Sequence, residues 1–153
     1  MMFVTAFLGL GSNLGDRASY LEDAVQKLGS HHLITICTRS SMHDTSPVGE
    51  IEQPNFLNMV VEIETSLLPK ELLGVCLSIE KANGRVRSSK WGPRTLDIDI
   101  LFYSNDIIEM DGLQIPHPEA HCRLFVLKPM AEIAENYIHP VTKEQISAIL
   151  QRM

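Results

Sequence analysis

The chain has 153 residues, 44% of them hydrophobic, and its formal net charge is −6 at neutral pH. This length suits one domain with a substantial core and leaves no room for a second catalytic domain, so we expect a single domain over residues 1–153. The net acidity excludes a protein that binds duplex nucleic acid through a broad basic surface.

The N-terminus and the cysteines both bear on where the protein works. The first ten residues are mostly apolar, but they lack the basic start of a signal peptide and are too few to cross a bilayer. We interpret them as a strand and expect no membrane contact. Cys37, Cys76 and Cys122 are widely spaced and odd in number, which indicates reduced thiols packed as small hydrophobic side chains. These features predict a cytoplasmic protein.

The first half of the chain predicts a strand, a helix and two further strands. Residues 3–10 form an apolar run, and apolar residues then recur at helical spacing up to Gly29. The segment from Leu33 to about Arg39 predicts a second strand, and residues 43–49 predict a loop. Residues 56–65 alternate as a third strand, with one face formed by Leu57, Met59, Val61 and Ile63.

The second half adds a helix, a strand and a mostly helical tail. The helix begins near Pro69 and ends near Gly84, and residues 95–103 predict the fourth strand. The order strand, helix, strand, strand, helix, strand is that of a ferredoxin-like α+β fold. We therefore expect a βαββαβ core, in which helices pack on one side of a mainly antiparallel sheet, followed by a helical C-terminal extension.

The most informative segment runs from Trp91 to Ile100. Asp97 and Asp99 stand two residues apart in the predicted fourth strand, so their side chains share one face and their Cα atoms lie roughly 6.6 Å apart. Two carboxylates this close repel unless a cation lies between them. Such hard oxygen ligands favour Mg²⁺ when phosphate is near. The opposite face of the strand would carry Leu96, Ile98, Ile100 and Phe102.

A basic loop comes directly before this strand. Four cations lie in residues 84–94 of a chain that is acidic as a whole, namely Arg85, Arg87, Lys90 and Arg94. Arginine binds phosphate oxygens in a bidentate manner, so the loop indicates an anion site beside the carboxylates. An isolated Asp-x-Asp pair would instead be typical of a solvated strand edge.

Two other motifs have weaker interpretations. His117 and His121 are four residues apart, with Glu119 and Cys122 close by, which is a possible zinc site; the prolines on either side of His117 disfavour a regular helical ligand pair. The glycines from Gly9 to Gly15 are spaced one residue too widely for a dinucleotide-binding fingerprint, so we exclude a Rossmann fold.

Six motifs spread over nearly the whole chain resemble a known family. They are Gly11-Ser12-Asn13-Leu14-Gly15-Asp16, Thr45-x-Pro47-x-Gly49, Phe56-Leu57-Asn58, Glu80 followed by Gly84-Arg85-Val86-Arg87, Trp91 to Ile100, and Pro116-His117-Pro118 with Arg123-x-Phe125-Val126-Leu127. Their order and spacing resemble the 6-hydroxymethyl-7,8-dihydropterin pyrophosphokinases, folate-pathway enzymes that move a pyrophosphoryl group from ATP to a pterin alcohol. The ferredoxin-like fold of that family agrees with the predicted order of elements.

The resemblance implies a role for each matching residue. Two Mg²⁺ ions would be held by Asp97 and Asp99 and would bridge the ATP phosphates, and the catalytic residues would be Arg85, Arg94, Asp97 and Asp99. ATP would contact Glu80, Arg87, Trp91, Arg94, Ile100, His117 and Arg123. The flat pterin would stack between two aromatic rings, and its site would comprise Thr45, Pro47, Val48, Phe56, Asn58, Trp91 and Phe125. Without the resemblance, Phe56 and Phe125 would be interpreted as core residues.

The expected partners are the two small substrates, ATP and the pterin, with neither nucleic acid nor membrane involved, and the chain would be a monomer or at most a weak dimer. Two other function classes remain as alternatives. One is a nucleotide-sugar transferase, although such enzymes need a larger nucleotide-binding domain. The other is a ferredoxin-like module that binds a small ligand or RNA without catalysis.

Overall fold

The computed structural model describes residues 2–46, 52–84 and 95–153. Its centre is a five-stranded sheet in the order β2-β4-β1-β5, with β3 also paired to β4, and every one of these pairings is antiparallel. The strands are β1 (Val4–Ser12), β2 (Ile34–Arg39), β3 (His43–Thr45), β4 (Phe56–Thr65) and β5 (Asp97–Tyr103). Strands β1, β2, β4 and β5 with the two intervening helices confirm the predicted βαββαβ core.

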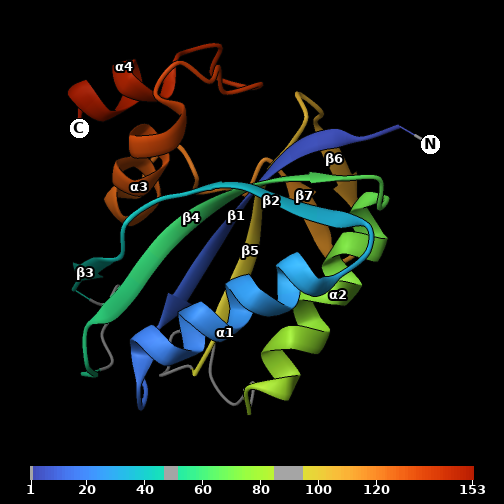
Figure 1. The fold of residues 1–153 in the computed structure, drawn as a ribbon. Helices are drawn as coiled ribbons and strands as arrows, with labels where there is room; N and C mark the ends of the chain where they lie inside the picture. The colour runs from blue at the N-terminus through green and yellow to red at the C-terminus, as the bar shows by residue number, and fades with distance from the viewer. Residues whose placement is uncertain (1, 47–51, 85–94) are drawn as a thin grey trace.

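The helices lie on both faces of this sheet. Figure 1 shows α1 (Arg17–Ser30) and α2 (Pro69–Ala82) crossing one face. The C-terminal helices α3 (Leu124–Ala134) and α4 (Ile146–Gln151) pack against the other face, so the tail completes a third layer. A small hairpin, β6 (Ile108–Met110) and β7 (Leu113–Ile115), follows β5. Among the described residues, none of the helices has the length and apolar character needed to cross a membrane.

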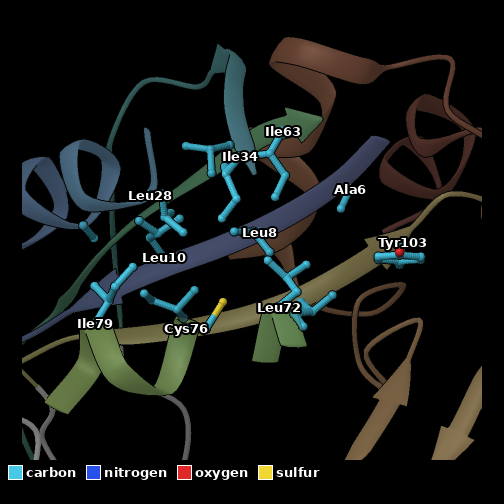
Figure 2. Close-up of a cluster of buried hydrophobic side chains, with 14 of the residues drawn as sticks. Ala6, Leu8, Leu10, Leu28, Ile34, Ile63, Leu72, Cys76, Ile79 and Tyr103 are labelled. Atoms are coloured by element: carbon cyan, nitrogen blue, oxygen red, sulfur yellow. The ribbon is translucent and has the colours of Figure 1, made fainter. Parts of the chain in front are cut away.

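The main core lies between the sheet and the first two helices. Figure 2 shows side chains of β1 and β4 meeting Leu28 of α1 and Leu72 and Cys76 of α2. Leu8 and Leu10 of β1 are almost completely buried there, because alternate residues of a strand point to the same side. Each of these two helices has a side-chain contact at its start: Asp16 accepts a hydrogen bond from the backbone N–H of Ser19 in α1, and Glu71 of α2 accepts one from the backbone N–H of Leu68.

The prediction that Phe102 shares a face with Ile100 is wrong. Ile100 pairs with Leu8 and Phe102 pairs with Phe7, so the register between β1 and β5 shifts at Leu101. This bulge adds one residue and reverses the alternation beyond it. Phe102 therefore packs on the α3 and α4 side of the sheet, where its ring centroid lies 6.3 Å from that of Phe7.

The prediction of a loop from residue 43 is also wrong at its start, because His43–Thr45 forms β3. The hydroxyl of Ser40 accepts a hydrogen bond from the backbone N–H of Val60 at 2.9 Å, where β2 has just ended. The chain then turns slightly and pairs again with the beginning of β4. As a result Thr45 lies beside Phe56, at the end of the sheet that carries the candidate site.

Candidate active site

The candidate site begins with two glycines of β1. Gly11 lies between Asn58 of β4 and Asp97 of β5, and Gly9 lies between Val60 and Asp99. Directly paired residues project from the same face of a sheet, so both carboxylates border positions that have no side chain. A Cβ atom on Gly11 would lie only 2.8 Å from the Asn58 Oδ1. The glycines therefore form the floor of a depression on the face opposite α1 and α2.

This depression is a cavity that is partly open to solvent and is lined by residues of β1, β4, β5 and the start of α3. Concave sites with apolar walls and a few polar groups are typical of small-molecule sites. One wall comes from β3 and the start of β4, and the other from the first turn of α3. The cavity brings together these predicted site residues: Thr45, Phe56, Asn58, Asp97, Asp99, Arg123 and Phe125.

The donor set at Asp97 and Asp99 fits Mg²⁺. Both carboxylates stand on the cavity face and both residues are partly accessible to solvent. Within residues 2–46, 52–84 and 95–153, no group of three or more His, Cys, Asp and Glu side chains could hold a metal ion. Mg²⁺ is usually held by one or two carboxylates and completes its coordination with water and substrate phosphates. A carboxylate pair beside open space suits this mode of binding, whereas a zinc site of three or four protein ligands is not present in that part of the chain.

Asn58 and Thr45 form a polar edge on the β-sheet side of the cavity. Asn58 is only 8% exposed, and its Nδ2 donates to the Thr45 Oγ1 at 2.6 Å. The Thr45 hydroxyl in turn donates to the backbone carbonyl of Phe56 at 3.4 Å. These bonds fix the orientation of the Asn58 amide, which is what a group that reads the edge of a ligand requires.

Phe125 and Arg123 lie at the opposite side, at the N-terminus of α3. The Arg123 guanidinium carbon is 5.3 Å from the Phe125 ring centroid, a cation–π contact. Arg123 also forms an ion pair with Glu119, one helical turn earlier in sequence. Phe56 and Phe125 are only partly buried and line the cavity, so both have ring surface available to a ligand.

His117 lies near Arg123 and Asp97, whose charges act on its imidazole, and the imidazole is mostly neutral at pH 7. Its backbone N–H donates to the carbonyl of Leu101 at 3.0 Å, and its Nδ1 accepts from the backbone N–H of Glu119 at 3.2 Å. Burial lowers the pKa of His117, and the charge of Arg123 lowers it further, against a smaller opposite effect of Asp97. The Nδ1 lone pair is thus in use, which leaves an Nε2–H that can donate a hydrogen bond at neutral pH.

Two predicted ATP-binding residues lie on the other side of the sheet. Glu80 of α2 is 3% exposed, and its carboxylate accepts a hydrogen bond from the backbone N–H of Ile98 at 2.8 Å. The side chain of Ile100 is buried in the core under α1 and α2. The structure therefore does not bring these side chains into the cavity. The remaining predicted residues, Pro47, Val48, Arg85, Arg87, Trp91 and Arg94, lie outside the described residues.

Sequence reasoning missed the residues that shape the cavity. Gly9 and Gly11 had a recognisable signal, since glycine inside a strand often marks a close approach of a ligand. Asn13 is 1% exposed, and its Nδ2 donates to the Gln53 side chain at 2.7 Å and to the Pro54 carbonyl at 3.0 Å. Arg17 donates to the Asn55 carbonyl at 3.0 Å. Asn13, in the motif that begins at Gly11, and Arg17, just after it, thus hold residues 53–55, the segment that leads into β4 and the cavity wall.

Comparisons with known proteins show to which proteins this chain is similar. Residues 7–135 match the model of the 7,8-dihydro-6-hydroxymethylpterin-pyrophosphokinase (HPPK) family. The 2-amino-4-hydroxy-6-hydroxymethyldihydropteridine pyrophosphokinase of Bacillus subtilis is 49% identical over 143 residues, which cover 94% of this chain and 83% of that protein. The protein of the same name from Methylorubrum extorquens is 47% identical over 133 residues, which cover 87% and 84%.

Solved structures share the fold. The HPPK-DHPS of Plasmodium falciparum with pteroate matches 99% of this chain with a TM-score of 0.77, at 16% sequence identity. This chain spans 42% of the length of that protein. The match to the family model and the identity to the curated relatives together show that the chain belongs to the HPPK family.

Proposed function

We propose that this chain transfers the pyrophosphoryl group of ATP to the hydroxymethyl group of 6-hydroxymethyl-7,8-dihydropterin, giving the pterin diphosphate and AMP. Membership of the HPPK family and the names of the relatives support this activity. The observation that carries it is the single cavity in which a carboxylate pair lies beside two aromatic rings and a buried amide. Such a cavity can hold a metal-bound polyphosphate and a flat heterocycle next to each other.

The pterin would bind between β4 and α3. Phe56 and Phe125 stand on opposite sides of the cavity and would stack on the two faces of the ring. Asn58, oriented by Thr45, would form hydrogen bonds with the edge of the ring. Pro47, Val48 and Trp91 are proposed to complete this site, as the resemblance to the family implies.

ATP would bind at the carboxylate end of the cavity. Asp97 and Asp99 would hold two Mg²⁺ ions, which when bound neutralise phosphate charge and lower the pKa of the pterin hydroxyl. Arg123 and the Nε2–H of His117 would contact the triphosphate. Glu80 would act indirectly, because its carboxylate accepts a hydrogen bond from the backbone N–H of Ile98, the residue between the two aspartates on β5. The proposed nucleotide site also includes Arg87 and Trp91, with Arg85 and Arg94 as catalytic cations, and it includes Ile100 only through its backbone, since its side chain is buried in the core.

The reaction needs alignment and charge neutralisation more than covalent help from the protein. The hydroxyl of the hydroxymethyl group loses its proton to solvent, and its oxygen forms a bond to the β-phosphorus of ATP. The bond between the β-phosphorus and the oxygen that bridges to the α-phosphorus breaks, and AMP leaves with that oxygen. The residues of the cavity would hold the two reacting atoms in line, and the cations would stabilise the charge on the leaving group.

The test is to incubate the purified chain with ATP, Mg²⁺ and 6-hydroxymethyl-7,8-dihydropterin and to separate the adenine nucleotides over time. We expect AMP that forms only when both the pterin and Mg²⁺ are present. ADP in place of AMP would indicate an ordinary kinase. A folded chain that produces neither nucleotide would favour the alternative of a ligand-binding or RNA-binding module.

The setting of the enzyme is also a proposal. We propose a cytoplasmic protein that works as a monomer or at most a weak dimer and has no nucleic-acid or membrane partner. Light scattering coupled to size-exclusion chromatography at several concentrations measures the oligomeric state. A mass near 17.1 kDa at all concentrations is the expected result.

A further inference from the structure

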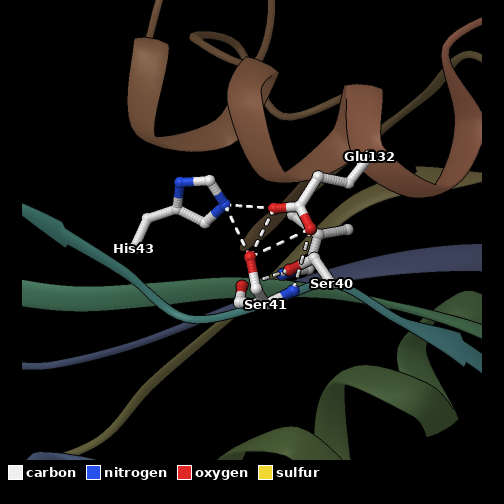
Figure 3. A network of polar contacts seen from close by, with 5 residues as sticks. Ser40, Ser41, His43 and Glu132 are labelled. Atoms are coloured by element: carbon white, nitrogen blue, oxygen red, sulfur yellow. Dashed lines mark hydrogen bonds and ion pairs between the residues drawn. The ribbon is translucent and has the colours of Figure 1, made fainter.

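A polar cluster outside the cavity joins its two walls. The carboxylate of Glu132 on α3 accepts hydrogen bonds from the Ser41 hydroxyl at 2.8 and 2.9 Å and from the Ser41 backbone N–H at 3.1 Å. It also forms a hydrogen-bonded pair with the Nε2 of His43. Figure 3 shows these groups between α3 and the strand segment below it. We call Ser41, His43 and Glu132 the wall-bridging cluster.

The residue types resemble a Ser-His-acid catalytic triad, but the arrangement is different. In a triad the histidine stands between the other two residues and uses one ring nitrogen for each. Here the Ser41 hydroxyl and the Glu132 carboxylate both face the same nitrogen, Nε2, and the hydroxyl donates directly to the carboxylate. The acid therefore does not hold the ring at Nδ1 while Nε2 takes the serine proton, which is the arrangement that activates a triad serine. The cluster is therefore a structural connection and not a nucleophile.

The sheet end of the cluster is firmly held. The neighbouring Ser40 is buried, its backbone N–H donates to the Val60 carbonyl at 2.9 Å, and its hydroxyl accepts from the Val60 N–H at 2.9 Å. Two residues beyond the cluster, Thr45 pairs with Phe56 and orients Asn58. Ser41 and His43 thus belong to the same rigid wall as the polar edge of the cavity.

On the α3 side of the cluster, the helix lacks one of its own backbone hydrogen bonds. Pro129 lies inside α3 and has no N–H, so it cannot donate the usual helical hydrogen bond to the carbonyl of Phe125, four residues earlier. The first turn of α3, which carries Phe125, is therefore less constrained by the helix itself. Glu132 follows Phe125 by seven residues, which is about two turns, so both point to the same side of the helix.

Charge strengthens the connection at neutral pH. Burial raises the pKa of Glu132, but hydrogen bonds from His43 and Ser41 outweigh this effect and leave the pKa below its usual 4.5. Glu132 is thus ionised, and hydrogen bonds to a carboxylate are stronger than those between neutral groups.

We propose that Glu132 is a positioning residue for the pterin: through Ser41 and His43 it sets the separation between Phe125 on α3 and Thr45 on β3. This inference rests on the proposed function, in which the ring of the pterin lies between these walls. A change at Glu132 should alter pterin binding more than ATP binding, because the aspartates that would hold the nucleotide stand on β5, and of the described residues proposed to contact ATP only Arg123 lies at the start of α3.

The experiment compares steady-state kinetics of Glu132→Gln and Ser41→Ala with those of wild type. Glu135→Gln is the matched control, because it makes the same change of charge at the exposed C-cap residue of α3, three residues further along the chain. We expect KM for the pterin to rise about fivefold to tenfold in the first two variants, as for the loss of one charge-assisted hydrogen bond, with KM for ATP changed less than about twofold. The control should resemble wild type.

A combination variant and a stability measurement complete the test. Because Glu132→Gln and Ser41→Ala both weaken the bond between the Ser41 hydroxyl and the Glu132 carboxylate, their effects on KM for the pterin should be less than additive in the double variant. Thermal unfolding separates loss of fold from loss of position, and Ser41→Ala, at an exposed residue, is the milder change. Equal changes in both KM values, or values that match the control, would overturn the role of Glu132. A wild-type chain that forms no AMP would instead overturn the proposed function.

Discussion

The two faces of the sheet, although built from the same strands, differ most at the end that carries the cavity. On the α1 and α2 face, β1 contributes Ala6, Leu8 and Leu10 to a closed apolar core. On the other face the same strand contributes Phe7, Gly9 and Gly11. Only the end near Phe7 is covered by α3 and α4, and the end with the glycines opens into the cavity.

This difference shows how a small domain can carry a polar site. Two close carboxylates and a buried amide contribute little to folding and can oppose it. Stability comes instead from the apolar clusters, because large side chains such as Leu8 and Leu72 under α1 and α2, and Phe102 under α3 and α4, are almost completely buried. We therefore expect changes at the cavity to affect catalysis and changes in the core under α1 and α2 to affect folding, and the following variants test this separation of the faces.

The largest effect should come from the carboxylates. Asp97→Ala or Asp99→Ala should lower kcat by about a thousandfold or more, because the metal-bound phosphates lose a ligand. The thermal midpoint should stay within a few degrees of wild type, since one of two repelling charges is removed. Asp106→Ala, at an exposed position just after β5, is the control. Unfolding of the aspartate variants, with no loss of activity in the folded fraction, would contradict the separation of the faces.

A core variant should have the opposite profile. Leu8→Ala removes a fully buried side chain from the α1 and α2 face and should lower the free energy of unfolding by about 2–5 kcal/mol. Urea unfolding measures this loss, while KM for both substrates in the folded enzyme should be near wild type. Leu77→Ala, where the leucine is 41% exposed, should cost much less. A large rise in KM for Leu8→Ala would show that the two faces are coupled.

The cavity floor permits a finer test. Gly11→Ala places a Cβ 2.8 Å from the Asn58 Oδ1 and should raise KM for the pterin about tenfold by displacing the amide. Gly9→Ala meets only the flexible end of Leu101, at 3.3 Å, and should have a smaller effect. KM for the pterin is measured from initial rates at saturating ATP. If Gly9→Ala raised this KM more than Gly11→Ala, Asn58 would not be a contact of the pterin.

The smallest effect is expected at a glycine far from the site. Gly74 lies inside α2, and a Cβ there would meet nothing within 4 Å. Gly74→Ala should stabilise the protein by about 0.5–1 kcal/mol, because alanine loses less conformational freedom in a helix. Chemical denaturation measures the gain, and kcat and both KM values should not change. Altered kinetics would connect α2 to the site.

Much of the fold and part of the site followed from local pattern. Alternation along residues 95–103 placed Asp97 and Asp99 on one face, and the motifs identified the family. The pattern failed at Phe102, where the bulge at Leu101 reverses the alternation, and at His43, where β3 forms by pairing with a distant strand. Both errors arise because a partner strand, and not the local sequence, sets the register.

The sequence by itself determined the order of elements, the shared face of Asp97 and Asp99, and the chemistry available in a carboxylate pair that follows a basic segment. Only the tertiary structure decided that Gly11 would lie between Asn58 and Asp97, that Glu80 would turn to the backbone of β5, and that Ser41 would meet Glu132, 91 residues away. The physical reason is range: periodicity and turn propensity act over a few neighbouring residues, whereas a cavity forms where distant segments pair and pack.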